Sequence, residues 1–154
     1  MGPPACPFVD DSLWPLLRVT YPRVIEVEEQ QQLFEGLAEY LERRERQLLM
    51  IDARLWQSAT AEHRVQQWQF LKAQTGPMRQ WSMGIVALIS SPSLALVGRI
   101  LIHRIKPSVV PYSIATSWPA TVSWAAARLE ENGLGAHALR VRQRLLPAAA
   151  GNTG

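Results

Sequence analysis

Two uninterrupted apolar runs constrain the fold more strongly than any other feature of the sequence. A strand with one face in water needs alternating polar and apolar side chains. Residues 48–51 (LLMI) and 83–89 (MGIVALI) show no such alternation. Each run is therefore predicted to be a central strand covered by protein on both faces. Segments with helical spacing lie between and around them. This alternation predicts an α/β fold, a mostly parallel sheet of four to five strands with helices on both faces.

Two further strands are expected at the margins of the sheet. Pro15 interrupts the apolar residues 13–19, and Pro111 falls within the apolar residues 109–115. Because proline cannot donate a hydrogen bond to a neighbouring strand, both segments are predicted to be edge strands. A short extended piece at residues 24–27 completes the expected strands.

Four helices are expected from apolar side chains at helical spacing. They cover residues 28–46, 60–75, 92–106 and 117–131. Thr60 and Ser117 are predicted N-caps, and Gly76-Pro77 is predicted to end the second helix. In that helix, the side chains expected to face the core are those of Ala61, Val65, Trp68 and Leu71.

The length of 154 residues predicts one domain with a short extension at each end. Residues 1–12 are expected to form a flexible arm, residues 13–133 the α/β domain, and residues 134–154 a basic extension with a disordered tail. The single cysteine excludes a disulfide framework within the chain. The three histidines do not show a recognised metal-binding spacing. We therefore expect no metal and no cofactor.

Charge is distributed unevenly along the chain. Residues 1–62 contain 11 of the 13 carboxylates and residues 63–129 contain none, so all charged side chains in that second stretch are basic. Such an excess favours an anionic partner, such as an acidic protein surface or lipid headgroups. Alternatively, the acidic side chains of the first helix neutralise these bases within the folded domain. Basic and aromatic residues do not alternate on any expected strand, so we expect no nucleic-acid binding.

Polar side chains follow both central strands, at the edge of the sheet where α/β proteins bind ligands. They are Asp52, Arg54, Trp56 and Ser58 after the first strand, and Ser90, Ser91 and Ser93 after the second. Asp52 and Arg54 either bind a partner or pair with each other at the strand end. Ser91 either contributes to an anion site or only caps the following helix. The glycine pattern of a phosphate-binding loop is absent from this region.

The third expected helix, residues 92–106, is apolar over more of its circumference than a surface helix needs. The apolar side chains outside the arc expected to face the sheet are Leu96, Ile100 and Ile102. One narrow polar wedge is formed by Arg99, His103 and Lys106. We predict that the surplus apolar surface is covered by the basic tail of the chain, by a second subunit or by lipid.

This succession of elements resembles STAS-like domains of the SpoIIAA-like family over residues 13–133. The segments that carry the resemblance are LLMIDAR, MGIVALISSPS and SWPATVSWAAARLE. The resemblance implies a non-enzymatic domain that binds partner proteins; some such domains are phosphorylation switches, and related ones hold lipids or apolar ligands. The switch form has a serine in a D-S-[ST]-G-type loop after the central strand. This chain has Asp52-Ala53-Arg54-Leu55 there, so no phosphorylated serine carries over.

We therefore expect a cytoplasmic, non-catalytic module for protein interaction or regulation. It is expected to dock a partner protein, or a second copy of itself, through residues 94–105 and the loop 52–58. The alternative is a protein that binds lipid or an apolar ligand and associates with anionic membrane surfaces. An enzyme, the third reading, needs convergent polar groups around Asp52 and Ser90. Serines and a proline interrupt the uncharged residues 80–98, so this stretch is not expected to span a membrane.

Overall fold

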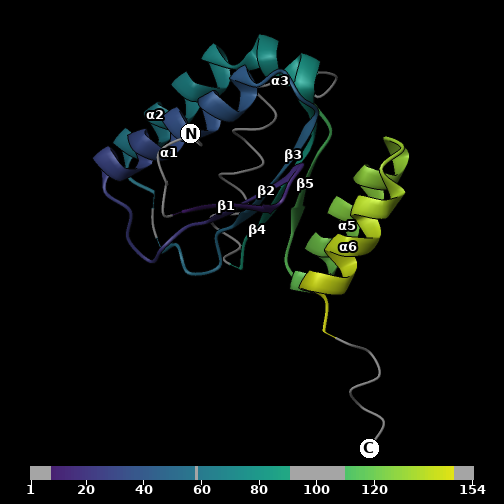
Figure 1. Ribbon diagram of the computed structural model, residues 1–154. Coiled ribbons are helices and arrows are strands. Elements are labelled where there is room, and N and C mark those ends of the chain that lie inside the picture. Colours follow the sequence, from purple (N-terminus) through teal and green to yellow (C-terminus); the bar gives the residue numbers. More distant parts are fainter. Residues whose placement is uncertain (1–7, 58, 91–109, 148–154) are drawn as a thin grey trace, which may run out of the picture.

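The computed structural model describes residues 8–57, 59–90 and 110–147, and the strands within them form one five-stranded sheet (Figure 1). The strands lie side by side in chain order: β1 (Val9–Leu13), β2 (Leu16–Thr20), β3 (Gln47–Asp52), β4 (Ser82–Leu88) and β5 (Tyr112–Ala115). β1 pairs antiparallel with β2, and the other neighbouring pairs are parallel. The predicted α/β fold with a mostly parallel sheet is confirmed, and so is the edge position of β5.

Side chains alternate between the two faces of the sheet along the central strands. In β3, Leu48 and Met50 belong to the core on one face, whereas Leu49 and Ile51 pack against the core on the other. Both faces therefore exclude water. This two-sided burial is the reason that the sequence of β3 lacks polar alternation.

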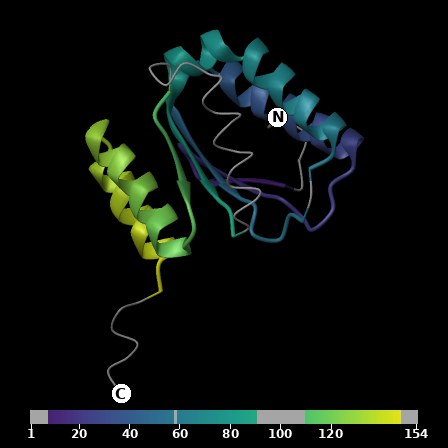
Figure 2. The same ribbon diagram turned by 180° about the vertical axis from the view of Figure 1, so that it is seen from behind.

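Helices cover both faces of the sheet, as predicted, and Figure 2 shows the same arrangement from behind. One face carries α1 (Val27–Glu42), α2 (Ala61–Ala73) and α3 (Thr75–Trp81), and the other carries α5 (Trp118–Glu131) and α6 (Gly135–Leu145). When parallel strands follow one another in chain order, right-handed crossovers place every connecting helix on the same face. The helices that follow β5 are therefore needed to cover the opposite face.

The face of the sheet beneath α5 and α6 has an apolar core. Val122, Ala125 and Leu129 of α5 are fully buried, as is Ala138 of α6. α5 begins as predicted, because the Ser117 hydroxyl accepts a hydrogen bond from a backbone N–H in its first turn.

The opposite layer combines aromatic stacking with a buried polar network. Phe34 of α1 stacks on Phe70 of α2, with 4.7 Å between ring centres. The buried side-chain amide of Gln30 donates to the side chain of Gln66 at 2.8 Å and to the backbone carbonyl of His63 at 3.1 Å. These bonds satisfy buried polar groups and fix α2 against α1.

The first strands differ from the prediction. The sequence predicts one edge strand at residues 13–19, but the structure has a hairpin that turns at Trp14 and Pro15, which are joined by a cis peptide bond. The edge position is wrong for β2, because β2 lies between β1 and β3. Proline ends one strand and precedes the next, because it cannot donate to the ladder. Residues 9–12, expected in a flexible arm, belong to β1 because they pair with β2.

The strand predicted at residues 24–27 is wrong, because this segment connects β2 to α1. Glu26 is the N-cap of α1, and a reciprocal capping box joins it to Glu29. Val27 therefore lies in the first turn of the helix, and Val24 is exposed in the loop before it.

The expected C-terminal extension also needs correction. Residues 135–145 form α6, and Ala138 and Val141 pack into the same core as α5. The alternation of basic and apolar residues in this segment places its apolar side against the domain and its arginines toward solvent. α6 is therefore part of the packed domain.

Two helices end at other places than predicted. α1 ends at Glu42 rather than near Arg46, because Arg44 takes a left-handed conformation with φ 57°. α2 ends at Ala73, and the predicted breaker Gly76-Pro77 lies in the first turn of α3. A proline is tolerated there, since the first N–H groups of a helix have no helical acceptor.

α2 begins after its predicted cap, Thr60, but presents most of the predicted core stripe to solvent. Leu71, the last member of that stripe, is partly buried and packs against a core cluster as predicted. Val65 is 53% exposed and Trp68 is 36% exposed, whereas His63 is buried. The first part of α2 faces inward with polar side chains because its partner on α1 is the amide of Gln30, whereas Phe70 further along the helix stacks on Phe34. A pattern of apolar residues does not reveal a polar partner on another helix, so the predicted face is wrong.

Candidate functional site

The candidate site lies at the carboxyl edge of the sheet. Asp52 is the last residue of β3, Arg54 and Trp56 lie in the loop that follows, and Ser90 follows β4. The other sequence-predicted site residues lie outside the described residues: Ser58, Ser91, Ser93, Leu96, Arg99, Ile100, Ile102, His103 and Lys106.

Asp52 and Arg54 form an ion pair with each other. Nε and Nη2 of Arg54 donate to Oδ1 and Oδ2 of Asp52 at 3.0 and 2.8 Å, and the Arg54 backbone N–H donates to Oδ1 at 3.1 Å. Partial burial of Asp52 opposes its ionisation, but the hydrogen bonds and the charge of Arg54 outweigh this effect and hold the pKa of Asp52 below its ordinary value. The sequence left two roles open for these residues, binding a partner or pairing with each other, and the structure shows that they pair with each other.

Arg54 is held by several elements at once. Its guanidinium carbon lies 5.1 Å from the ring centre of Trp118 in α5, and its backbone carbonyl accepts a hydrogen bond from the Ser90 hydroxyl at 3.2 Å. Trp118 donates in turn from Nε1 to the carbonyl of Leu145 in α6 at 2.6 Å. Sequence reasoning missed Trp118, because its position after Ser117 signals only the start of a helix.

Trp56 packs against the edge of the domain rather than projecting from it. Its ring lies against Tyr21, with 4.9 Å between ring centres, and its buried Nε1 has no hydrogen-bond partner among the described residues. Burial raises the pKa of the Tyr21 hydroxyl, because an ionised phenolate loses its hydration there. Trp56 therefore anchors the loop, and its ring is not a free contact surface.

Two exposed apolar side chains flank this edge. Leu55 is 60% exposed and Val24 is 65% exposed. Their loops are adjacent, because the N–H of Gln57 donates to the carbonyl of Arg23 at 3.3 Å. Sequence reasoning included Leu55 only as part of the predicted docking loop 52–58 and did not single it out. It missed Val24, which it placed in a strand.

The polar groups of this edge are occupied by one another. The Asp52 carboxylate is bound by Arg54, and the Ser90 hydroxyl donates to a backbone carbonyl. Within the described parts of the chain, no group of three or more histidine, cysteine or acidic side chains is arranged to hold a metal ion. Among the described residues of this edge, Leu55 and Val24 therefore offer exposed apolar surface to a partner, with arginines beside them.

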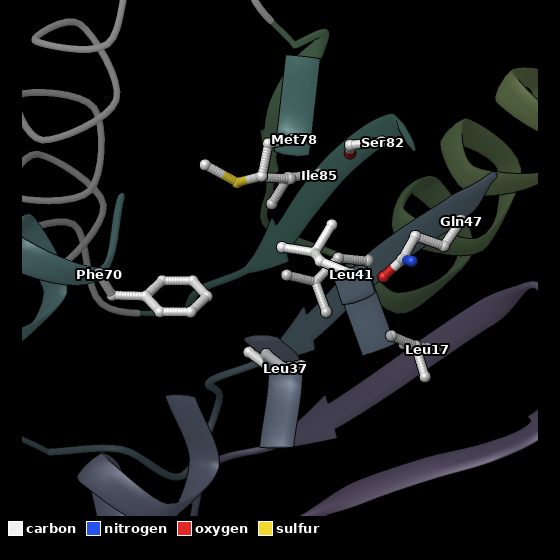
Figure 3. A pocket seen from close by; sticks show the side chains of 9 residues that line it. Leu17, Leu37, Leu41, Gln47, Phe70, Met78, Ser82 and Ile85 are labelled. Atoms are coloured by element: carbon white, nitrogen blue, oxygen red, sulfur yellow. The ribbon is translucent and has the colours of Figure 1, made fainter. Parts of the chain in front are cut away.

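A small cavity lies between the sheet and the layer of α1, α2 and α3. Figure 3 shows apolar side chains around it, with Phe70 on one side and Gln47 on the other. Its volume is about 30 Å³, whereas pockets for small ligands usually measure about 300 Å³ or more. The amide of Gln47 already donates to the carbonyls of Tyr40 and Glu45. The cavity is therefore a packing gap and gives no support to a bound acyl chain.

No helix in the described residues combines the length and the apolar character needed to cross a membrane. Comparisons of the chain with protein-family models, with curated proteins and with solved structures found no match.

Proposed function

We propose that this chain is a non-catalytic docking module that binds a partner protein at the carboxyl edge of its sheet. The observation that carries the proposal is the presence of exposed Leu55 and Val24 on two adjacent loops. A partner that removes these side chains from water gains about 25 cal/mol for each Å² of apolar surface buried. The polar groups beside them pair internally, so the edge is equipped for contact rather than for reaction.

The loop that carries Leu55 is fixed on both sides. The preceding residue, Arg54, is held by Asp52 and Trp118, and the following residue, Trp56, packs on Tyr21. A loop that is ordered before binding loses little conformational entropy when a partner arrives. This preorganisation suits a docking surface.

The flanking charges indicate the chemistry of the partner. Arg23 is exposed beside Val24, and the side chain of Arg54 is 47% exposed beside Leu55. A complementary surface therefore has an apolar centre and an acidic rim. Residues 94–105, the other proposed contact segment, lie outside the described residues.

The proposed module is of STAS-like type. The described segments that carry the resemblance occur in the order that it implies: a central strand with its D-x-R loop, a second central strand and a closing helix. The loop after the central strand holds an ion pair in place of the serine of a phosphorylation switch. Support for the proposal therefore concerns docking and does not extend to phosphorylation.

Site-specific photocrosslinking in the cells that produce the protein tests this proposal. A photoreactive residue at position 55 is expected to capture one discrete partner. The same residue at Leu139, which is 57% exposed on α6 at the other face, is the matched control. Equal capture at both positions, or none at position 55, contradicts the proposal.

A second comparison separates docking from folding. Leu55→Asp is expected to abolish the crosslink from position 24, whereas Leu139→Asp leaves it intact. Both substitutions fall on exposed side chains, so each is expected to change the free energy of unfolding by no more than about 0.5 kcal/mol. A crosslink at position 24 that survives Leu55→Asp contradicts the proposal.

A further inference from the structure

The outer face of α2 carries a ridge that the proposed docking edge does not use. Its members lie on one side of the helix and are all exposed: Arg64, Val65, Trp68 and Lys72. Arg64, Trp68 and Lys72 are spaced by four residues, so a cation, an aromatic ring and a second cation follow one another along the helix. We call these four residues the basic ridge.

The basic ridge has no compensating carboxylate along its own helix face. Glu62 is the one acidic residue of α2, and it lies about 120° or more around the helix from Trp68 and from Arg64. No acidic residue follows in the chain until Glu130. Arg64 donates to the backbone carbonyl of Ala59, which leaves its positive charge unneutralised.

The neighbouring helix carries the opposite charge. Exposed carboxylates form an acidic stripe along one side of α1, made of Glu28, Glu35, Glu39 and Glu42. Their spacings of seven, four and three residues return to the same side of the helix. α1 and α2 run side by side, joined by the Phe34–Phe70 stack (Figure 1).

The two surfaces do not neutralise each other within one chain. None of the ion pairs formed among the described residues includes a member of the acidic stripe or of the basic ridge. Glu35 accepts a hydrogen bond from Gln31. Among the described residues, each surface is therefore exposed without an ion-pair partner for its charge, beside a surface of opposite sign.

We infer that the protein associates with itself, the basic ridge of one copy contacting the acidic stripe of another. A second copy carries both required charges, and Val65 and Trp68 supply the apolar area that surface ion pairs alone lack. An anionic membrane matches the ridge but leaves the acidic stripe without a partner. This inference uses a different surface from the proposed docking edge, so either can fail without the other.

Charge reversal tests the inference in the full chain. Wild-type protein is expected to show a mass above that of a monomer by sedimentation velocity, rising with protein concentration and falling with added salt. Trp68→Ala is expected to weaken association by about tenfold or more. A wild-type protein that stays monomeric throughout a wide concentration range at low salt overturns the inference.

Two reversed variants make the test specific. Arg64→Glu with Lys72→Glu makes both surfaces acidic. Glu35→Lys with Glu39→Lys leaves the stripe with two lysines and two glutamates, so that it no longer carries net charge. Each variant alone is therefore expected to be monomeric. An equimolar mixture of the two is expected to associate again, because unlike surfaces meet. A mixture that stays monomeric overturns the inference.

A control and a competing readout complete the design. Arg140→Glu with Arg144→Glu reverses two exposed cations of α6, which lie four residues apart, and is expected to leave association unchanged. Loss of association in this variant overturns the assignment to α2. Vesicles of phosphatidylserine and phosphatidylcholine are tested in parallel. Vesicle binding that needs Arg64 and Lys72, by a protein that stays monomeric in solution, overturns self-association and assigns the ridge to a membrane.

Discussion

The two helical layers hold the same sheet by different means. Beneath α5 and α6 the core is apolar, and the Trp124 ring packs so closely on Gly84 that a Cβ there would lie 2.8 Å from the ring. Beneath α1, α2 and α3 lie the cavity and the polar network around Gln30. The layer of α5 and α6 is closely packed and apolar. The layer of α1, α2 and α3 depends on specific hydrogen bonds and leaves apolar residues on its outer face.

The largest expected effect comes from truncating one leucine in each layer. Leu129 is fully buried in the α5 layer, and Leu37 lines the cavity in the other. Leu129→Ala is expected to lower the free energy of unfolding by about 3–5 kcal/mol. Leu37→Ala is expected to cost less, about 2–3 kcal/mol, because a side chain beside a gap has fewer contacts to lose. Urea unfolding of both variants measures the difference, and equal losses contradict the contrast between the layers.

A glycine substitution tests how closely the layer of α5 and α6 packs on the sheet. Gly84→Ala is expected to lower the free energy of unfolding by about 2–3 kcal/mol, because the new Cβ meets Trp124 and also lies 3.3 Å from Leu48. The φ of 156° at this position, which residues with a Cβ rarely adopt, adds to the loss. Gly76→Ala is the control, since a Cβ at that helical position meets nothing within 4 Å. It is expected to stabilise the protein by up to about 1 kcal/mol. A neutral result for Gly84→Ala shows that the Trp124 ring moves aside easily.

The same contrast explains how far the sequence predicts the fold. Residues 48–51 and 83–89 predict buried central strands because an unbroken apolar run indicates an apolar environment on both faces of the strand. The helix at residues 117–131 is predicted from its apolar spacing for the same reason, since Val122 and Leu129 of α5 pack on an equally apolar sheet. Where an element packs through hydrocarbon, its own sequence indicates which side is buried.

Prediction fails where the partner is polar or local geometry decides. The inner side of the first part of α2 is polar because Gln30 lies opposite it, and no pattern within α2 reveals that amide. At the candidate site, the sequence places Asp52 and Arg54 at one strand end but cannot tell a mutual ion pair from a binding pair. The sequence predicts the loop 52–58 as a docking segment but does not single out Leu55, and it misassigns Val24, because a single exposed apolar residue carries no periodic signal.

A near-isosteric change at Gln30 tests the layer that depends on polar bonds. Gln30→Leu keeps the volume but removes the donor to Gln66 and to the carbonyl of His63, so the free energy of unfolding is expected to fall by about 1–2 kcal/mol. Amide hydrogen exchange is expected to quicken in α2 and to stay slow in α5. Gln32→Leu, at an exposed position of the same helix, is the control. Uniform quickening in both layers contradicts a local role for the network.

The smallest expected effect concerns the ion pair between β3 and the loop that carries Leu55. The folded state lowers the pKa of Asp52, so the pair stabilises the fold above the unfolded pKa of about 3.9 and loses this contribution as the pH falls through the folded value. Asp52→Asn is expected to cost less than about 1 kcal/mol at neutral pH, because Arg54 is nearly half exposed and solvent screens the pair. The difference between variant and wild type is expected to vanish in acid, as measured by urea unfolding at several pH values. A difference that persists in acid means that Asp52 acts through its shape and its hydrogen bonds rather than its charge. The loop that carries Leu55 is then held mainly by the packing of Trp56 and Trp118. Packing also holds α5 and α6 on their face of the sheet.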